Sequence, residues 1–113
     1  MKKTFTYTAL AILAVIGIAQ AAFIDKGSTE VSVAHAKEMK DNTPVRLKGN
    51  IIQNLGDEKY LFTDGNQTII VEIDTEDWGG QDVSAKDTVI ITGEIDKDLF
   101  GTEIDVETVQ LVQ

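Results

Sequence analysis

The residues with the clearest capacity for chemistry lie near the C-terminus, in a stretch that almost matches a calcium-binding loop. Counting from Asp96, carboxylates occupy the third and twelfth positions of the loop pattern, at Asp98 and Glu107. Gly101 occupies the sixth position, but Phe100 stands at the fifth, where a ligand oxygen is required. An EF-hand also needs a helix on each side, whereas here apolar and polar residues alternate on both sides, which is typical of strands. We therefore expect a hairpin at this place and no dedicated metal site.

Such a hairpin would bring like charges together. If Ile95 faces Ile104, the acidic residues beside them also face each other across the two strands. Like charges directly opposite on a sheet repel, and a bound cation would relieve that repulsion. We expect polyamines, cationic peptides or weakly bound divalent cations as ligands, with little preference for Ca²⁺ over Mg²⁺. The candidate ligand-binding carboxylates are Glu72, Asp74, Glu94, Asp96, Asp98, Glu103 and Asp105. Arg46 and Lys48 are expected to offset part of this charge.

Aromatic residues form a second set of candidates. Tyr60 and Phe62 would share one face of a strand, where each ring either belongs to the core or contacts a ligand. Trp78 lies in a loop followed by two glycines, where it either closes the end of the fold or stacks on a sugar. Peptidoglycan-like glycans are therefore a further ligand class. Phe100, in the acidic hairpin, is the remaining aromatic candidate.

Residue types that catalyse reactions are scarce. His35 is the single histidine, and the chain has no cysteine. No spacing or motif gives Ser28, Ser32 or Ser84 a His-Asp partner. We therefore expect a binding protein that is not an enzyme and that uses no cofactor.

The N-terminus has the three regions of a secretory signal peptide. Lys2 and Lys3 precede an apolar run at residues 9–19, and small residues follow at Ala19 and Ala21. The apolar run is too short to cross ~30 Å of hydrocarbon. We expect cleavage between Ala21 and Ala22, export, and no membrane anchor after cleavage. Residues 1–21 would be the leader, 22–31 a flexible lead-in and 32–113 the folded domain.

The charge balance excludes one class of partner. The whole chain has a formal net charge of −9, and removal of the leader with its two lysines makes the remainder more negative. An acidic surface repels phosphate backbones, so we expect no nucleic-acid binding.

The elements that must position these residues follow from hydrophobic periodicity. A short helix is predicted at 32–40, with Ser32 as its cap. Five strands with a period of two follow, separated by turns at 54–59, 64–66 and 96–102 and by a loop at 75–87. Near Glu107 and Thr108 the alternation changes phase, which indicates a bulge. The predicted core consists of Val45, Leu47, Ile51, Ile69, Val71, Ile73, Val89, Ile91, Ile95, Ile104 and Val106.

Five strands, with glycines at Gly49 and Gly93 inside two of them, predict an all-β fold. We expect a five-stranded OB-fold Greek-key barrel preceded by the short helix, because glycine permits the coiling that closes so few strands. In the usual order of this barrel, the third strand lies beside the fifth, which adds Glu72 and Asp74 to the acidic patch. The alternative is an open antiparallel meander with one helix.

Several segments, taken in order, resemble a known family. These are Gly49-Asn50-Ile51, Tyr60-x-Phe62, Lys86-Asp87-Thr88-Val89, Gly93-Glu94 and Asp96-Lys97-Asp98. Together they resemble the bacterial OB-fold (BOF) family of YgiW/YdeI-like proteins over residues 31–112. The chain departs from this pattern at Leu99, near which a tryptophan is expected.

The resemblance implies a periplasmic protein, a helix ahead of the barrel, and no long helix between strands three and four. It also implies a link to tolerance of stresses such as cationic peptides, peroxide, acid and metals, and no general catalytic motif. We expect a periplasmic binding module that contributes to envelope stress tolerance through its acidic barrel face. The alternative is an interaction protein without a small ligand, which regulates an envelope partner through the same face.

Overall fold

A computed structural model of the chain describes residues 29–113, so the predicted leader, its cleavage site and residues 22–28 lie outside the described part. The elements, in chain order, are α1 (Val33–Ala36), β1 (Pro44–Gly56), β2 (Lys59–Thr63), β3 (Thr68–Ile73), the 3-10 helix η2 (Thr75–Trp78), β4 (Val89–Asp98) and β5 (Gly101–Leu111). Within residues 29–113, none of the helices has the length and apolar character needed to span a bilayer.

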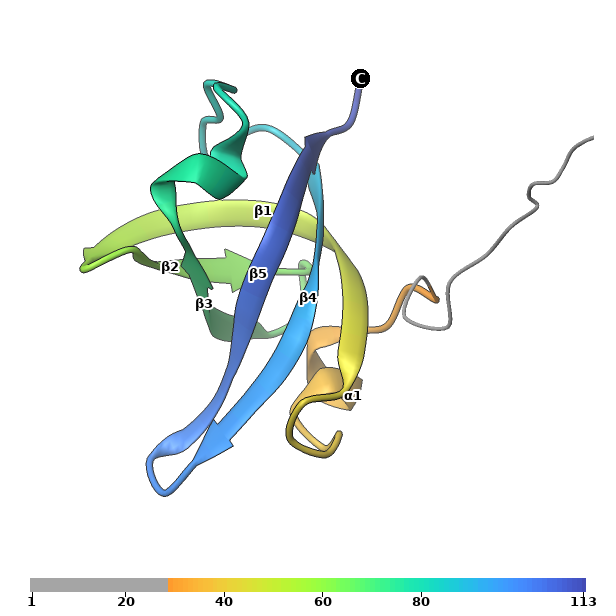
Figure 1. Cartoon of the computed structure of the whole chain (residues 1–113). Helices are drawn as coiled ribbons and strands as arrows, with labels where there is room; N and C mark the ends of the chain where they lie inside the picture. The colour runs from red at the N-terminus through yellow and green to blue at the C-terminus, as the bar shows by residue number, and fades with distance from the viewer. Residues whose placement is uncertain (1–28) are drawn as a thin grey trace, which may run out of the picture.

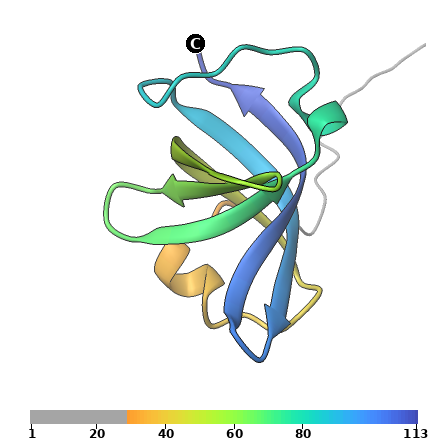
Figure 2. The ribbon, with the colours of Figure 1, turned by 90° about the vertical axis from the view of Figure 1, so that its left-hand side faces the viewer.

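The five strands form a closed barrel in the order β1-β2-β3-β5-β4, with β4 pairing back onto β1 (Figures 1 and 2). Neighbouring strands are antiparallel except β3 and β5, which run parallel. Closure removes the free sheet edges that an open meander would leave. The predicted OB-fold barrel with a short helix before it is therefore confirmed.

Two glycines allow the barrel backbone to close. A Cβ atom on Gly49 would lie 2.0 Å from the carbonyl oxygen of Thr63, and one on Gly93 would lie 2.1 Å from that of Asp105. Neither distance is possible for a real side chain, so β1 can cross β2, and β4 can cross β5, only where no side chain stands between them. Beside Gly93, the register of β5 shifts between Thr108 and Val106, which confirms the predicted bulge.

The barrel interior holds one hydrophobic core. All eleven predicted core residues are buried, and Phe62 joins them with no exposed surface. The first turn of α1 covers one end of this core, because Val33 and Ala36 are fully buried. The Ser32 hydroxyl accepts a hydrogen bond from the backbone N–H of His35, as predicted for the cap.

The turn between β2 and β3 holds the helix in place. The Asp64 carboxylate accepts backbone hydrogen bonds from Gln67, Val33 and Asn66, and these hydrogen bonds lower the pKa of Asp64. The Val33 bond joins the β2–β3 turn to the start of α1 over 2.9 Å.

The structure corrects several predicted boundaries. The predicted turn at 54–59 is wrong, because β1 continues to Gly56 and only Asp57 and Glu58 form the turn, both with positive φ. The turn between β4 and β5 is likewise reduced to Leu99 and Phe100. The helix ends at Ala36 instead of residue 40.

The last residues of the predicted lead-in pair with the barrel. Glu30 forms a parallel bridge with Arg46, and the N–H of Val31 donates to the Arg46 carbonyl at 2.9 Å. These two residues therefore lie alongside β1 and pair with it at Arg46.

Candidate functional site

The outer surfaces of β3, β5 and β4 carry the acidic side chains that the sequence predicted to lie together. Across β4 and β5, Ile95 pairs with Ile104. This register places two pairs of carboxylates directly opposite each other, and we call each such directly opposed pair a rung. The paired carboxylates are Glu94 with Asp105, Asp96 with Glu103 and, across the parallel β3–β5 pair, Glu72 with Asp105. We call these five residues the acidic face.

Lys59 is the cation of this face. It stands opposite Glu72 at the start of β2, and its Nζ lies 2.9 Å and 3.1 Å from the two carboxylate oxygens of Glu103. The Lys59–Glu103 pair is the only side-chain ion pair among residues 29–113. The hydrogen bond to Glu103 raises the pKa of Lys59. One lysine thus faces five carboxylates, and most of the negative charge of the face stays uncompensated.

The two basic residues predicted to offset this charge do not do so. Arg46 pairs with Thr92 and Lys48 with Ile90, both on the part of β4 that precedes the acidic rungs. Arg46 Nε is buried without a hydrogen-bond partner. The role of Lys59 was not predicted, because the residue fell in the predicted turn at 54–59, where the direction of a side chain is not fixed.

Glu72 is the carboxylate of the face most affected by its surroundings. Partial burial raises the pKa of Glu72, and the nearby charge of Asp105 raises it further, while Lys59 acts in the opposite direction. Protonation of Glu72 is therefore easier than that of an isolated glutamate. A bound cation would act in the opposite direction, because it stabilises the charged form.

Asp74 lies beyond the end of β3 and belongs to a neighbouring cluster. Carboxylate oxygens of Glu58, Glu72 and Asp74 lie within 4.8 Å of one another. The charge of Glu58 raises the pKa of Asp74, with smaller contributions from burial and from Glu76. Glu58 Oε2 also accepts the Thr75 N–H at 3.1 Å, which holds the carboxylate near the start of η2. The cluster continues the acidic face toward the β1–β2 hairpin.

The two other predicted residues of the hairpin lie away from the rungs. Asp98 is the last residue of β4, and its Oδ1 accepts the N–H of Phe100 at 2.8 Å. Phe100 is almost fully exposed at the turn. The flanks of this turn are strands, so the resemblance to a calcium loop is not accompanied by EF-hand geometry.

Tyr60 and Trp78 meet at one end of the barrel. Their rings lie 5.2 Å apart at 79°, an edge-to-face arrangement, and both are only partly buried against the core. They line an open pocket of about 470 Å³ together with Ile51, Ile52, Gln53, Asn54, Gln81, Asp82, Val83 and Ala85. Trp78 thus packs against the core and also lines a pocket, and stacking on a sugar stays a prediction.

Gln81 holds the loop that carries Trp78. Its Nε2 donates to the carbonyls of Trp78 and Val109 at 2.8 Å and 2.7 Å, and its Oε1 accepts the N–H of Leu111 at 3.2 Å. The role of Gln81 could not be predicted from the sequence, since a lone glutamine in a loop carries no motif. The pocket wall is therefore fixed to β5.

Sequence comparison places these features in a family. The model of the Bacterial OB fold (BOF) protein family matches residues 16–111. Protein YgiW of Escherichia coli K12 is 46% identical over 81 residues, which cover 72% of this chain and 62% of YgiW. The match thus spans less than two thirds of YgiW. The calcium-regulated OB-fold protein CarO of Pseudomonas aeruginosa is 41% identical over 85 residues, covering 75% of this chain and 73% of CarO.

Structural comparison agrees. The solved structure of the hypothetical protein YgiW from E. coli superposes with a TM-score of 0.73 at 44% identity. The superposition covers 75% of this chain and 91% of that chain.

Proposed function

The chain belongs to the bacterial OB-fold (BOF) family, and from this premise we propose that it is a non-catalytic binding module for cationic ligands. The observation that carries the proposal is the pairing of like charges on the acidic face, with Lys59 as its single ion-paired cation within the described residues. The ligand class is polycationic: a polyamine or a basic peptide.

The physical argument is one of relieved repulsion. Each directly opposed pair of carboxylates destabilises the sheet by roughly a few tenths of a kcal/mol. A ligand with several positive charges spaced along a flexible chain can neutralise all three rungs at once. Because Glu94, Asp96 and Asp105 are exposed, the attraction is screened by salt, and we expect weak, salt-sensitive binding.

We propose that this binding takes place in the periplasm and contributes to tolerance of envelope stress. Support comes from the signal-peptide pattern of residues 1–21 and from the resemblance to YgiW/YdeI-like proteins. Expression of the full chain in a Gram-negative host tests the location: the exported protein should have the intact mass of a chain that begins at Ala22. A mass that retains Lys2 and Lys3 would contradict cleavage.

The binding test uses spermine and a matched pair of variants, followed by calorimetry. Changing Glu72, Glu94, Asp96 and Asp105 to their amides leaves the Lys59–Glu103 pair intact and should abolish most spermine binding. The control variant changes four exposed carboxylates elsewhere, at Glu38, Asp57, Asp82 and Glu107, and alters net charge equally. Spermine affinity that falls equally in both variants would show a general charge effect and refute a localised face.

Divalent cations are a weaker second ligand on the same surface. CarO is described as calcium-regulated, and the Glu58–Glu72–Asp74 cluster gathers three carboxylates within 4.8 Å. For this chain we propose weak binding at that cluster with little preference for Ca²⁺ over Mg²⁺. Titration with each ion at about 0.5 M salt, where screening is strong, should show little binding. Tight Ca²⁺ binding under that condition would contradict the proposal.

A second candidate function rests on the Tyr60–Trp78 pocket. Its walls combine aromatic rings with the amides of Gln53 and Asn54, a composition that suits stacking and hydrogen bonding to a glycan. Trp78 is the only tryptophan, so its fluorescence reports on this pocket alone. Titration with soluble muropeptides should change that emission in the wild type. An unchanged spectrum at saturating muropeptide would refute glycan binding here.

A further inference from the structure

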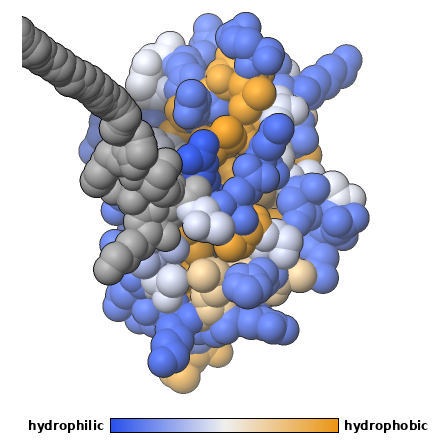
Figure 3. Space-filling view, turned by 90° about the vertical axis from the view of Figure 1, so that its right-hand side faces the viewer, coloured by the Kyte–Doolittle hydropathy of each residue, from blue (hydrophilic) through white to orange (hydrophobic). Residues whose placement is uncertain are grey.

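The tip of the β4–β5 hairpin exposes two large apolar side chains. Leu99 is 98% exposed and Phe100 is 96% exposed, whereas the next most exposed large hydrophobic residues within 29–113, Ile52 and Leu55, are 40% and 44% exposed. The hairpin projects beyond the rest of the barrel (Figure 1). Figure 3 shows hydrophobic surface at the lower end of the molecule, the end where this turn lies in Figure 1.

The backbone holds the tip in a defined shape. Asp98 pairs with Gly101 as the last rung, Asp98 Oδ1 accepts the Phe100 N–H at 2.8 Å, and Gly101 has a φ of 143°. Few loop residues would have to be ordered on binding, so the entropic cost of docking is low. A permanently displayed apolar pair on a rigid hairpin is typical of an anchor that enters a partner's pocket.

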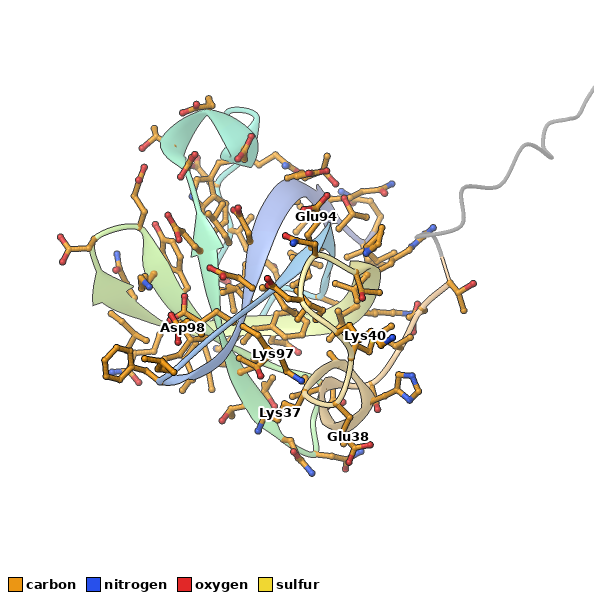
Figure 4. All side chains as sticks on the ribbon, turned by 60° about the horizontal axis from the view of Figure 1, so that its bottom comes forward. Lys37, Glu38, Lys40, Glu94, Lys97 and Asp98 are labelled. Carbon is orange, nitrogen blue, oxygen red and sulfur yellow. The ribbon has the colours of Figure 1, made fainter. Side chains whose placement is uncertain are left out.

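The base of the hairpin is also fixed. Where its pairing with β1 ends, β4 is bordered by residues 41–43. The N–H of Lys97 donates to Asp41 Oδ1 at 2.8 Å, and the N–H of Ile95 donates to the Thr43 carbonyl at 2.9 Å. Figure 4 shows Lys97 and Asp98 near the hairpin end of β4, with Glu94 further back. The hairpin is therefore a rigid extension of the barrel.

The possible occupants of the tip are a membrane surface, a second copy of this chain and a different folded protein. The charge next to the tip disfavours the first two. Asp96 and Asp98 lie on one face of the hairpin beside Glu103, while Lys97 is on the opposite face of β4. Anionic lipid headgroups would repel these carboxylates, so a membrane surface is unfavourable. A second copy of the chain is unfavourable too, because each copy carries a net charge of −9 and the pocket at Tyr60 and Trp78 includes Asp82.

The size of the tip indicates how much more of the hairpin must be in contact. A phenylalanine and a leucine bury at most about 400 Å² together, while a stable interface needs roughly 800 Å² from each partner. The remaining area must come from surface beside the tip, which is acidic. A partner that covers it must therefore be basic around an apolar socket.

We propose that Leu99 and Phe100 anchor this chain to a folded protein partner that offers an apolar pocket rimmed by basic residues. The acidic rungs nearest the tip supply the charged contacts, and in that respect the inference rests on the cation-binding face proposed above. The apolar anchor adds selectivity, because a free polyamine has no socket for the tip.

The first experiment identifies what the tip touches. A photocrosslinking amino acid is placed at position 99 of the full chain in cells, and at position 55 as a control on an exposed residue of β1. We expect position 99 to crosslink one discrete protein, with the crosslinked peptide identified by mass spectrometry, and position 55 not to crosslink it. Crosslinks to phospholipid, to this chain itself, or to nothing would overturn the proposal.

The second experiment measures binding of the purified crosslinked protein to the full chain. L99S/F100S should weaken it by about thirtyfold or more, the loss expected for a hot spot, with an unchanged Tm and unchanged spermine affinity. L55S, the control for lost apolar surface outside the Tyr60–Trp78 pocket, should leave partner affinity unchanged. Partner affinity that is unchanged in L99S/F100S would refute the anchor. Loss of spermine binding in the acidic-face variant tests the earlier proposal separately.

Discussion

At the scale of single residues, Lys59 determines how strongly the acidic face repels itself. It is the one ion-paired cation of the described residues and bonds both oxygens of Glu103. Replacing it by Met keeps the aliphatic stem but leaves Glu72, Glu103 and Asp105 with no opposing charge. The residue therefore connects the stability of the free domain to its affinity for cations.

We predict that Lys59→Met destabilises the free domain and binds spermine severalfold more tightly at low salt. Both effects follow from the added repulsion, which spermine then relieves. Thermal unfolding and calorimetry measure the two effects, and Lys48→Met, on the part of β1 away from the face, serves as the control. Weaker spermine binding by Lys59→Met would show that Lys59 forms part of the ligand site.

The raised pKa of Glu72 makes the stability of the fold depend on pH. Its pKa is raised above the ordinary value near 4.5 by burial and by Asp105, and the pKa of Asp74 is raised mainly by Glu58. A group with a raised folded pKa stabilises the protein below its unfolded pKa, and this contribution is lost as pH rises through the folded pKa. Lowering the pH from 7 to about 4.5, the ordinary pKa of a glutamate, should therefore increase the free energy of unfolding through Glu72.

The opposing groups titrate outside this window. The pKa of Asp64 is lowered from about 3.8, so its contribution to stability is lost only at lower pH. The pKa of Lys59 is raised from 10.5, so its contribution to stability changes only near and above that pH. Glu72→Gln should reduce the gain between pH 7 and about 4.5, as measured by denaturant unfolding at both values, while Glu38→Gln should retain it. An equal gain in wild type and Glu72→Gln would mean that Glu72 has an ordinary pKa.

At the scale of elements, the parts of strands that enclose the core could be predicted and the parts that extend beyond it could not. Alternation identified the buried residues of all five strands, because one face of each strand meets the core. Residues 52–56 of β1 are exposed on both faces and therefore show no alternation. The same lack of burial hid the true turn at Asp57 and Glu58, and with it the position of Lys59.

The candidate site likewise has a part that could be predicted from the sequence and a part that could not. The two β4–β5 rungs of the acidic face could be predicted, because pairing Ile95 with Ile104 fixes the rung on either side. The Glu72–Asp105 pair depends in addition on β3 lying beside β5. The contact between Tyr60 and Trp78 could not, because it depends on how η2 and the Gln81 hydrogen bonds orient an irregular loop. Local sequence carries little information about such a tertiary arrangement.

Gly93 allows a direct test of how β4 crosses β5. We predict that Gly93→Ala lowers the free energy of unfolding by about 1–3 kcal/mol, the usual cost of overpacking. The added Cβ would lie 2.1 Å from the Asp105 carbonyl and 2.8 Å from Val106 Cα, and both are backbone atoms that cannot rotate away. Urea denaturation measures the loss. A variant as stable as the wild type would show that the two strands can separate without breaking the barrel.

At the scale of the whole molecule, the barrel makes the acidic face possible. Closure places β3, β5 and β4 side by side with every interior position apolar, so the face needs no contribution to the core. The stability of the barrel comes from its buried side chains, and the like-charge rungs are a cost that the fold can bear. Binding surfaces commonly carry such a local cost, which a ligand then relieves.

This arrangement predicts an unusual response of the free protein to salt. Screening reduces repulsion between exposed charges, and the Debye length falls from about 10 Å at 0.1 M to about 3 Å at 1 M. Three like-charge rungs at a few tenths of a kcal/mol each amount to about 1 kcal/mol. In a domain of this size that energy corresponds to about 4–8 °C in Tm. Raising sodium chloride from 0.02 to 0.5 M should therefore raise the wild-type Tm by a few degrees.

The amide variant of Glu72, Glu94, Asp96 and Asp105 separates local repulsion from the overall negative charge. At low salt it should have a higher Tm than the wild type and a smaller response to sodium chloride, because its rungs no longer repel. The control at Glu38, Asp57, Asp82 and Glu107 has the same net charge and should keep most of the wild-type response. If both variants respond to salt alike, the excess charge of the whole chain destabilises the fold, and the acidic face has no special cost for a cation to relieve.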